Sequence, residues 1–167
     1  KCSVRNEWHI VPSIRISDAL FLRRNNIYPK FTLNSAKALT TDTMHRVTVN
    51  KNKDIITNKK IKLKSLIASY YNSLSLAFTE ICGRSHGGGA LELMPNEVED
   101  VLIPYNEKND KILLKIDTMI RDKVDINEIL AYTDEIVLKK GFGFSDSEIK
   151  IANDIWKKLL KRRLNRT

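Results

Sequence analysis

The chain has 167 residues, of which 42% are hydrophobic, and its net charge is +9. This length and apolar content are typical of about one domain with a proper core, and they argue against wholesale disorder. No run approaches the ~18 consecutive apolar residues of a membrane helix, and the first residues do not resemble a signal peptide. Two cysteines, Cys2 and Cys82, are too few for a disulfide framework, so a reduced intracellular compartment is expected.

Positive charge is concentrated in the first part of the chain. Residues 1–64 hold 14 Lys and Arg against 4 Asp and Glu, whereas residues 65–104 hold 1 against 5 and residues 105–167 hold 14 against 11. A segment this basic is typical of a surface that binds a polyanion, although a well-solvated surface is as ordinary an interpretation. The basic residues do not lie on an amphipathic helix, which disfavours a membrane surface as the partner.

The segment before residue 63 is predicted to be short and extended. Its strand candidates are 9–16, 19–22, 30–34 and 45–49. Pro12 makes the first of them an edge or bulged strand, and Asn25 with Asn26 forms a turn-like break. These patterns predict a small, mostly antiparallel β unit.

Helical periodicity follows. Apolar residues recur at i, i+3 and i+4 over about 63–82, which predicts one long amphipathic helix. Tyr70 and Tyr71 fall on its apolar face and are expected in the core. Gly83 is expected to end the helix in the left-handed conformation.

A glycine block comes next, because four of the six glycines lie within 83–89. Glycine allows positive φ and close approach of another surface, so this block beside Arg84 and His86 is predicted to contact a partner. A strand-like run over 90–94 leaves it, and Pro95 starts a new element.

The chain after Pro104 is predicted to be helical. One helix spans about 110–123, a second begins at the N-cap Asp125 and ends at Gly141, and a third opens with a capping box over 145–148. The basic residues at the end of the third helix would interact favourably with the helix dipole, and contacts to phosphates are an equally good explanation for them.

Together these elements predict an α+β fold. A small, mostly antiparallel β unit packs on the long amphipathic helix, and a helical C-terminal region follows. We expect a domain over 1–104, with its central helix at about 63–82, and a helical subdomain over 105–167.

Patterns typical of catalysis are missing. Cys82 and His86 lie four apart, but no second ligand pair stands at zinc-binding spacing. The glycine block lacks the Lys-Ser/Thr that closes a P-loop. Residues 142–144 have the form Phe-Gly-Phe, but they lie between two predicted helices, not after a strand as in a methyl-donor loop. The residues therefore favour binding over catalysis.

Four segments in succession resemble one family. They are 41–46, 69–74, 83–95 and 103–104. The succession is similar to the C-terminal target-recognition region of adenine-specific DNA methyltransferases from bacterial type II restriction–modification systems, of the Eco57I and Taq kind. The resemblance covers nearly the whole chain, and the glycine block with its flanks is the specific part.

The resemblance implies a division of labour. In that family an N-terminal Rossmann-like domain holds S-adenosylmethionine and a catalytic Asn/Asp-Pro-Pro-Tyr/Phe motif. The C-terminal region grips double-stranded DNA and reads the target, while the adenine is flipped into the catalytic pocket. This chain has neither the tetrapeptide nor a cofactor loop, so no catalytic, cofactor-binding or metal-binding residue is expected in it. Its expected partners are DNA and the N-terminal methyltransferase domain, in the bacterial cytoplasm.

The resemblance and the residue types together give the candidate DNA contacts. Contacts to phosphates or guanine edges are expected from Arg23, Arg24, Lys30, Arg46 and Arg84. Polar contacts are expected from Thr41, Thr43, His45, Ser85 and His86, where the two histidines have a structural hydrogen bond as an equal alternative. Close approach of the backbone is expected at Gly87, Gly88 and Gly89. A place in the core, not a stacking role, is expected for Trp8, Tyr71, Phe78 and Trp156.

Three alternatives remain open from the sequence. One is half of a type I specificity subunit, which the short C-terminal helices disfavour. Another is part of a bifunctional restriction–methylation protein. The last is a basic α+β module that binds another protein.

Overall fold

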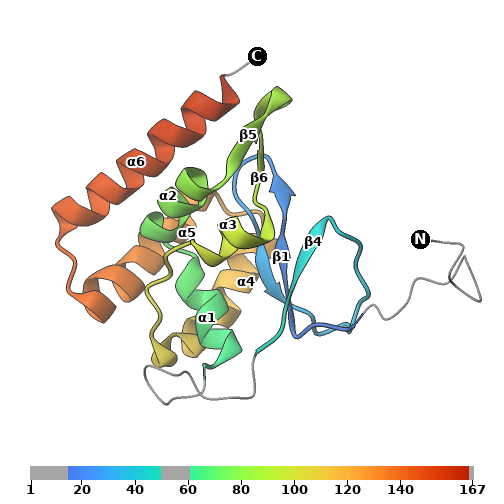
Figure 1. The fold of residues 1–167 in the computed structure, drawn as a ribbon. Helices are drawn as coiled ribbons and strands as arrows, with labels where there is room; N and C mark the ends of the chain where they lie inside the picture. Colours follow the sequence, from blue (N-terminus) through green and yellow to red (C-terminus); the bar gives the residue numbers. More distant parts are fainter. Residues whose placement is uncertain (1–14, 50–60, 166–167) are drawn as a thin grey trace, which may run out of the picture.

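The computed structural model describes residues 15–49 and 61–165 and confirms the α+β fold (Figure 1). Two three-stranded antiparallel sheets lie beside a group of helices. Most of the strand predicted over 9–16 and the core position expected for Trp8 lie outside the described residues.

The first sheet confirms three predicted strands. Its central strand β1 (Ala19–Leu22) pairs with β3 (Phe31–Leu33) on one side and β4 (Met44–Val47) on the other. Phe21 and Phe31 are direct partners in the register, and both rings meet the ring of Tyr70 edge-on, at centroid distances of 5.3 and 5.9 Å. Such edge-to-face aromatic contacts stabilise the packing of this sheet on the helix that carries Tyr70.

The second sheet includes the glycine block and the strand-like run that was predicted after it. Strand β6 (Ala90–Glu92) lies between β2 (Arg24–Asn25) and β5 (Arg84–His86), and the turn Gly87–Gly89 joins β5 to β6. The block is therefore the tip of a β-hairpin. Leu91 of β6 is buried, and this burial fixes which face of β6 points into the core.

The single long helix predicted over 63–82 is wrong. The structure has two helices, α1 (Leu63–Tyr70) and α2 (Ser73–Cys82), separated at Tyr71 and Asn72. Asn72 has an extended backbone and its side chain accepts a hydrogen bond from the Ser75 backbone N–H at 2.9 Å, so it starts a new helix as an N-cap. Periodicity alone did not reveal the break because apolar residues continue on both sides of it.

Gly83 also differs from its predicted role. Its φ of −80° and ψ of 166° are extended, not left-handed. A Cβ at this position would stand 2.7 Å from Leu91 Cδ1. The same Cβ would stand 3.0 Å from the Thr79 carbonyl oxygen, so close packing against α2 and the hairpin favours glycine here, and the helix ends without a left-handed residue.

The region after β6 is helical as predicted. Its helices are α3 (Pro95–Glu99), a 3-10 helix (Glu107–Ile112), α4 (Leu113–Arg121), α5 (Ile126–Asp134), a π-helix (Glu135–Lys140) and α6 (Asp146–Leu164). Asp125 caps α5 by accepting from the Asn127 N–H, and the capping box of Ser145 and Glu148 opens α6. No helix in the described part of the chain is both long and apolar enough to span a bilayer.

One hydrophobic cluster contains residues from both sides of the predicted boundary at 104. It includes Phe21, Tyr70 and Tyr71 together with Ile116 and Trp156. The core positions expected for Tyr70, Tyr71 and Trp156 are confirmed, and Phe78 packs against the same cluster while partly buried. The division into 1–104 and 105–167 stays a prediction.

Candidate nucleic-acid interface

The second sheet carries basic side chains on one face. Directly paired residues of an antiparallel sheet point to the same side, and residues two apart on one strand do too. Arg24 and Arg84 are both direct partners of Glu92, and His86 lies two residues after Arg84. We call Arg24, Arg84 and His86, grouped around Glu92, the basic face.

Glu92 is the centre of this face. Its side chain is only 8% exposed, and its Oε1 lies 3.0 Å from Arg24 Nη2 and 3.1 Å from Arg23 Nε. Its other oxygen, Oε2, lies 2.8 Å from His86 Nε2. Burial raises the pKa of Glu92, but the hydrogen bond and charge of Arg24 and the charges of Arg23 and His86 outweigh it, so the pKa lies below the ordinary value.

The cations around this buried carboxylate are open to solvent. The side chains of Arg24 and Arg84 are each 64% exposed, and that of His86 is 46% exposed. One nitrogen of Arg24 is held by Glu92, which leaves other N–H donors of the guanidinium facing outward. The arrangement can present oriented donors to a ligand rich in acceptors.

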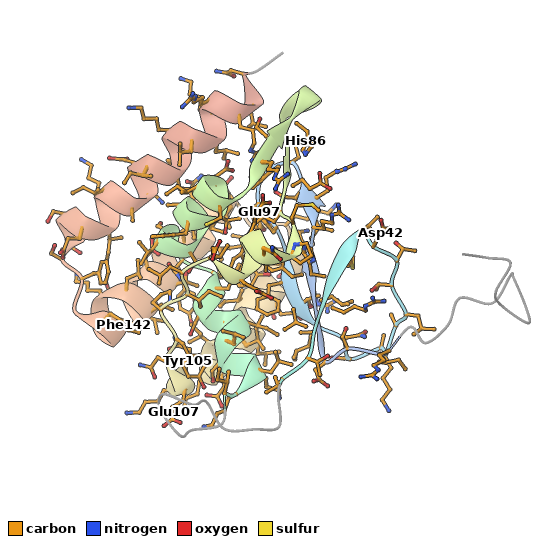
Figure 2. The ribbon with its side chains drawn as sticks, viewed as in Figure 1. Asp42, His86, Glu97, Tyr105, Glu107 and Phe142 are labelled. Carbon is orange, nitrogen blue, oxygen red and sulfur yellow. The ribbon has the colours of Figure 1, made fainter. Side chains whose placement is uncertain are left out.

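A second carboxylate, Glu97 on α3, holds Arg84. The Nε of Arg84 donates to Glu97 Oε1, and the backbone N–H of Met94 donates to Glu97 Oε2 at 2.7 Å. The Met94 hydrogen bond is the main reason that the pKa of Glu97 lies below its usual value, and Arg84 lowers it further. Figure 2 shows Glu97 on α3 and His86 on the hairpin.

The loop before β4 reaches the same region through Arg23. The Arg23 backbone N–H donates to the Thr43 carbonyl at 3.2 Å, and its guanidinium donates to the Asp42 carbonyl at 3.3 Å. The hydroxyl oxygens of Thr41 and Thr43 lie 3.0 Å apart, and both residues are exposed. Thr41 and Thr43 are thus brought beside the basic face.

The three glycines of the hairpin tip have different surroundings. Gly87 and Gly88 are exposed, and a Cβ on either would meet no atom within 4 Å, although Gly88 has a φ of +72°. Gly89 also has a φ of +72° but is buried, and a Cβ there would stand 3.2 Å from the Cα of Leu164 on α6. Only Gly87 and Gly88 are therefore free to approach another molecule closely; the hairpin projects beside the end of α6 (Figure 1).

Four predicted contact residues lie outside the basic face. Ser85 stands between Arg84 and His86 on β5, so it points to the other side of the sheet, as does its direct partner Leu91. His45 is partly buried and its Nε2 lies 2.7 Å from the Leu93 carbonyl, a hydrogen bond that links β4 to the end of β6. Lys30 lies on an open groove of about 660 Å³ between β3 and α4. Arg46 is exposed on β4 as the direct partner of Leu20. The two cations remain candidates for phosphate contacts outside the basic face.

Comparison with known families agrees with the resemblance. The family model of the C-terminal domain of type II methyltransferase M.Eco57I matches residues 1–138. The chain belongs to this family. No curated protein and no solved structure matches the chain.

The helix α6 lies beyond the residues that the family model matches, and it contributes a buried arginine. Arg163 donates from Nε and Nη2 to the two carboxylate oxygens of Glu80, at 2.9 and 2.6 Å. Its Nη1 donates to the carbonyls of Gly89 and Asn26. Arg163 is one of the basic residues at the end of α6, for which the sequence left open an interaction with the helix dipole or with phosphates. In the structure it binds Glu80 and backbone carbonyls inside the protein.

The carboxylates that organise the basic face, Glu92 and Glu97, were not expected from the sequence. A signal for Glu92 was present, because it stands between Leu91 and Leu93 in a strand whose alternation places it on the polar side. Within residues 15–49 and 61–165, no three His, Cys, Asp or Glu side chains are grouped as metal ligands.

Proposed function

We propose that this chain is the DNA target-recognition portion of an S-adenosylmethionine-dependent, adenine-specific DNA methyltransferase of a bacterial restriction–modification system. The observation that carries the proposal is the basic face on the hairpin sheet, in a chain that belongs to a type II methyltransferase family. The cofactor and the catalytic motif would belong to an N-terminal domain of the parent protein in the bacterial cytoplasm. This chain would supply binding and site choice.

The shape of the hairpin suits a duplex. The major groove of B-DNA is about 12 Å wide and admits a two-stranded β-ribbon. The end of the β5–β6 hairpin extends beyond β2 as a two-stranded ribbon, and the exposed Gly87 and Gly88 at its tip carry no side chain that would hold the backbone away. Arg84 lies on the outer strand of the ribbon with an exposed guanidinium, where it would meet phosphates or base edges.

A gel-shift titration of the chain, and of the parent methyltransferase, with duplex DNA tests this function. We expect Arg84→Ala to weaken binding by roughly 10- to 100-fold, the range for a lost arginine contact, and to reduce the dependence of log K on log salt by about one. Gly88→Val should also weaken binding, because a β-branched residue strains a left-handed turn at the tip.

Gly87→Ala is the matched control for the tip. Its Cβ would meet no atom within 4 Å and its φ is not left-handed, so the hairpin should keep its shape and most of its affinity. Unchanged affinity and site choice in both Arg84→Ala and Gly88→Val would remove the hairpin from the DNA interface. A protein-binding module would instead show no DNA affinity, or an affinity that depends on salt and not on sequence.

A further inference from the structure

We propose that Glu92 is the positioning residue of the basic face, which orients Arg24 and His86 so that the arginine reads a G·C base pair of the target. This inference rests on the proposed function and deepens it by separating side chains that read bases from those that attract DNA. Glu92 itself is buried and touches no base; it acts through the side chains that it holds.

The contacts of Glu92 are divided between its two oxygens. Oε1 accepts a hydrogen bond from Arg24 and lies 3.1 Å from Arg23 Nε, whereas Oε2 lies 2.8 Å from Nε2 of His86 on the adjacent strand. Arg24 and His86 lie on the two strands that flank β6. One carboxylate therefore fixes donors across the full width of the sheet.

Charge argues that this carboxylate serves orientation, not attraction. DNA affinity without sequence preference comes from cations that neutralise phosphates, and a negative charge among them opposes it. The low pKa of Glu92 keeps it ionised at neutral pH. A carboxylate does not help a surface that only attracts DNA. A surface that must discriminate between base sequences does benefit, because the carboxylate holds an arginine in one orientation.

The free donors of Arg24 fit a guanine. A guanidinium has five N–H donors in a planar fork, and its usual specific contact is bidentate, to O6 and N7 of guanine in the major groove. Glu92 holds Nη2 of Arg24 at 3.0 Å, and the rest of this side chain is mostly exposed. A held fork loses less conformational freedom on binding than a freely rotating one.

The experiment uses the 167-residue chain and a library of duplexes with a randomised core. Selection with the wild type defines a preferred sequence, and affinities are then measured for that duplex, for single G·C replacements and for a scrambled duplex. Glu92→Gln is compared with Glu135→Gln, which makes the same charge change at an exposed carboxylate paired with Lys139 and Lys140 on the π-helix.

We expect Glu92→Gln to lose roughly 10- to 100-fold discrimination at a G·C position. Its affinity for the scrambled duplex should be unchanged or higher, because the face gains one net positive charge. Glu135→Gln should keep the discrimination of the wild type. Wild-type discrimination in a folded Glu92→Gln variant would overturn the proposal.

Circular dichroism shows whether Glu92→Gln is folded. If it is not, Arg24→Lys decides, because it keeps the charge at an exposed position but lacks the planar fork. Loss of discrimination at one G·C position with retained affinity for scrambled DNA would support the proposal, and undiminished discrimination would overturn it. A wild type that prefers no sequence at all would contradict the proposed function itself, before any variant is compared.

Discussion

Two arginine–carboxylate systems in this chain have the same chemistry in different surroundings. At Arg163 and Glu80 both side chains are only 3% exposed, and the guanidinium uses its donors on Glu80 and on backbone carbonyls. At Glu92 the carboxylate is buried, but its partner Arg24 is 64% exposed. Exposure of the guanidinium, not the presence of a partner, separates an internal clamp from a surface that can bind a ligand.

We call the Arg163–Glu80 ion pair the internal clamp. It lies where four segments of the chain meet. Arg163 belongs to α6, Glu80 to α2, Gly89 to the hairpin and Asn26 to the turn after β2. The hairpin that carries part of the basic face is therefore anchored by the buried Arg163, which donates to the Gly89 carbonyl at its tip. The four predictions below test this contrast, beginning with the largest effect.

Arg163→Ala should have the largest effect on stability. It leaves Glu80 as a buried charge without its partner and removes donors from two carbonyls, and breaking a buried pair in this way costs about 3–5 kcal/mol. Urea unfolding followed by circular dichroism measures the change. Arg162→Ala, at the exposed neighbouring position, should change the free energy of unfolding by no more than about 0.5 kcal/mol. Equal effects of the two substitutions would mean that the pair is not a clamp.

Gly89→Ala should have an intermediate effect. A Cβ would stand 3.2 Å from Leu164 Cα, and the residue would have to keep a φ of +72°, so we expect a loss of about 1–3 kcal/mol. Gly87→Ala has no such contact and should stay within about 0.5 kcal/mol of the wild type. Similar thermal unfolding of the two variants would show that the stability of the hairpin does not depend on the close packing of Gly89 against Leu164 of α6.

Asp134 shows what a buried carboxylate does when its contacts are hydroxyl and amide donors. It accepts from the Ser73 N–H at 2.8 Å and the Ser73 hydroxyl at 2.6 Å. Burial raises its pKa above the ordinary value, and the hydrogen bonds from Ser73 offset this only in part. Because the folded pKa exceeds the unfolded value of about 3.9, the stability that Asp134 contributes is complete below about pH 4 and is lost as pH rises through the folded pKa.

Asp134→Asn should therefore become more stable relative to the wild type as pH rises from about 4 towards neutrality. Unfolding in urea at a series of pH values measures the difference between the two proteins. The effect should be smaller than that of Arg163→Ala, since no buried charge is left unpaired. A difference that does not change with pH would contradict the raised pKa.

Arg84→Ala should have the smallest effect on stability. The arginine is 64% exposed, and ion pairs at the surface contribute about 0–1 kcal/mol, so the unfolding free energy should change by at most about 1 kcal/mol. Its effect on DNA affinity is expected to be much larger. A large loss of stability with unchanged DNA binding would mean that Arg84, like Arg163, stabilises the fold and does not contact DNA.

Much of the fold could be predicted because the deciding interactions are local. The strands around Phe21 and Phe31, the N-cap Asp125 and the capping box at Ser145 depend on residues close in sequence. The prediction of one helix over 63–82 failed because the apolar spacing continues on both sides of the capping residue Asn72 and so does not show the break.

The candidate site was predicted in part. Arg24, Arg84 and His86 were expected as contacts, and the structure brings them together, although their role in DNA binding stays a prediction. Their grouping around Glu92 could not be expected, because β2 and β5 are about 60 residues apart in sequence and meet only through β6. The internal bond of His45 to the Leu93 carbonyl likewise needs the tertiary structure.

The sequence by itself determined the α+β class, most of the elements, the aromatic core and the family, because periodicity, caps and motif order are written in short segments. The tertiary structure decided which charges are buried and which are exposed. Electrostatic roles depend on desolvation, and desolvation depends on what packs nearby from distant parts of the chain. Arg163 and Arg24 are both arginines with a glutamate partner, and only the fold makes one a clamp and the other a candidate reader of DNA.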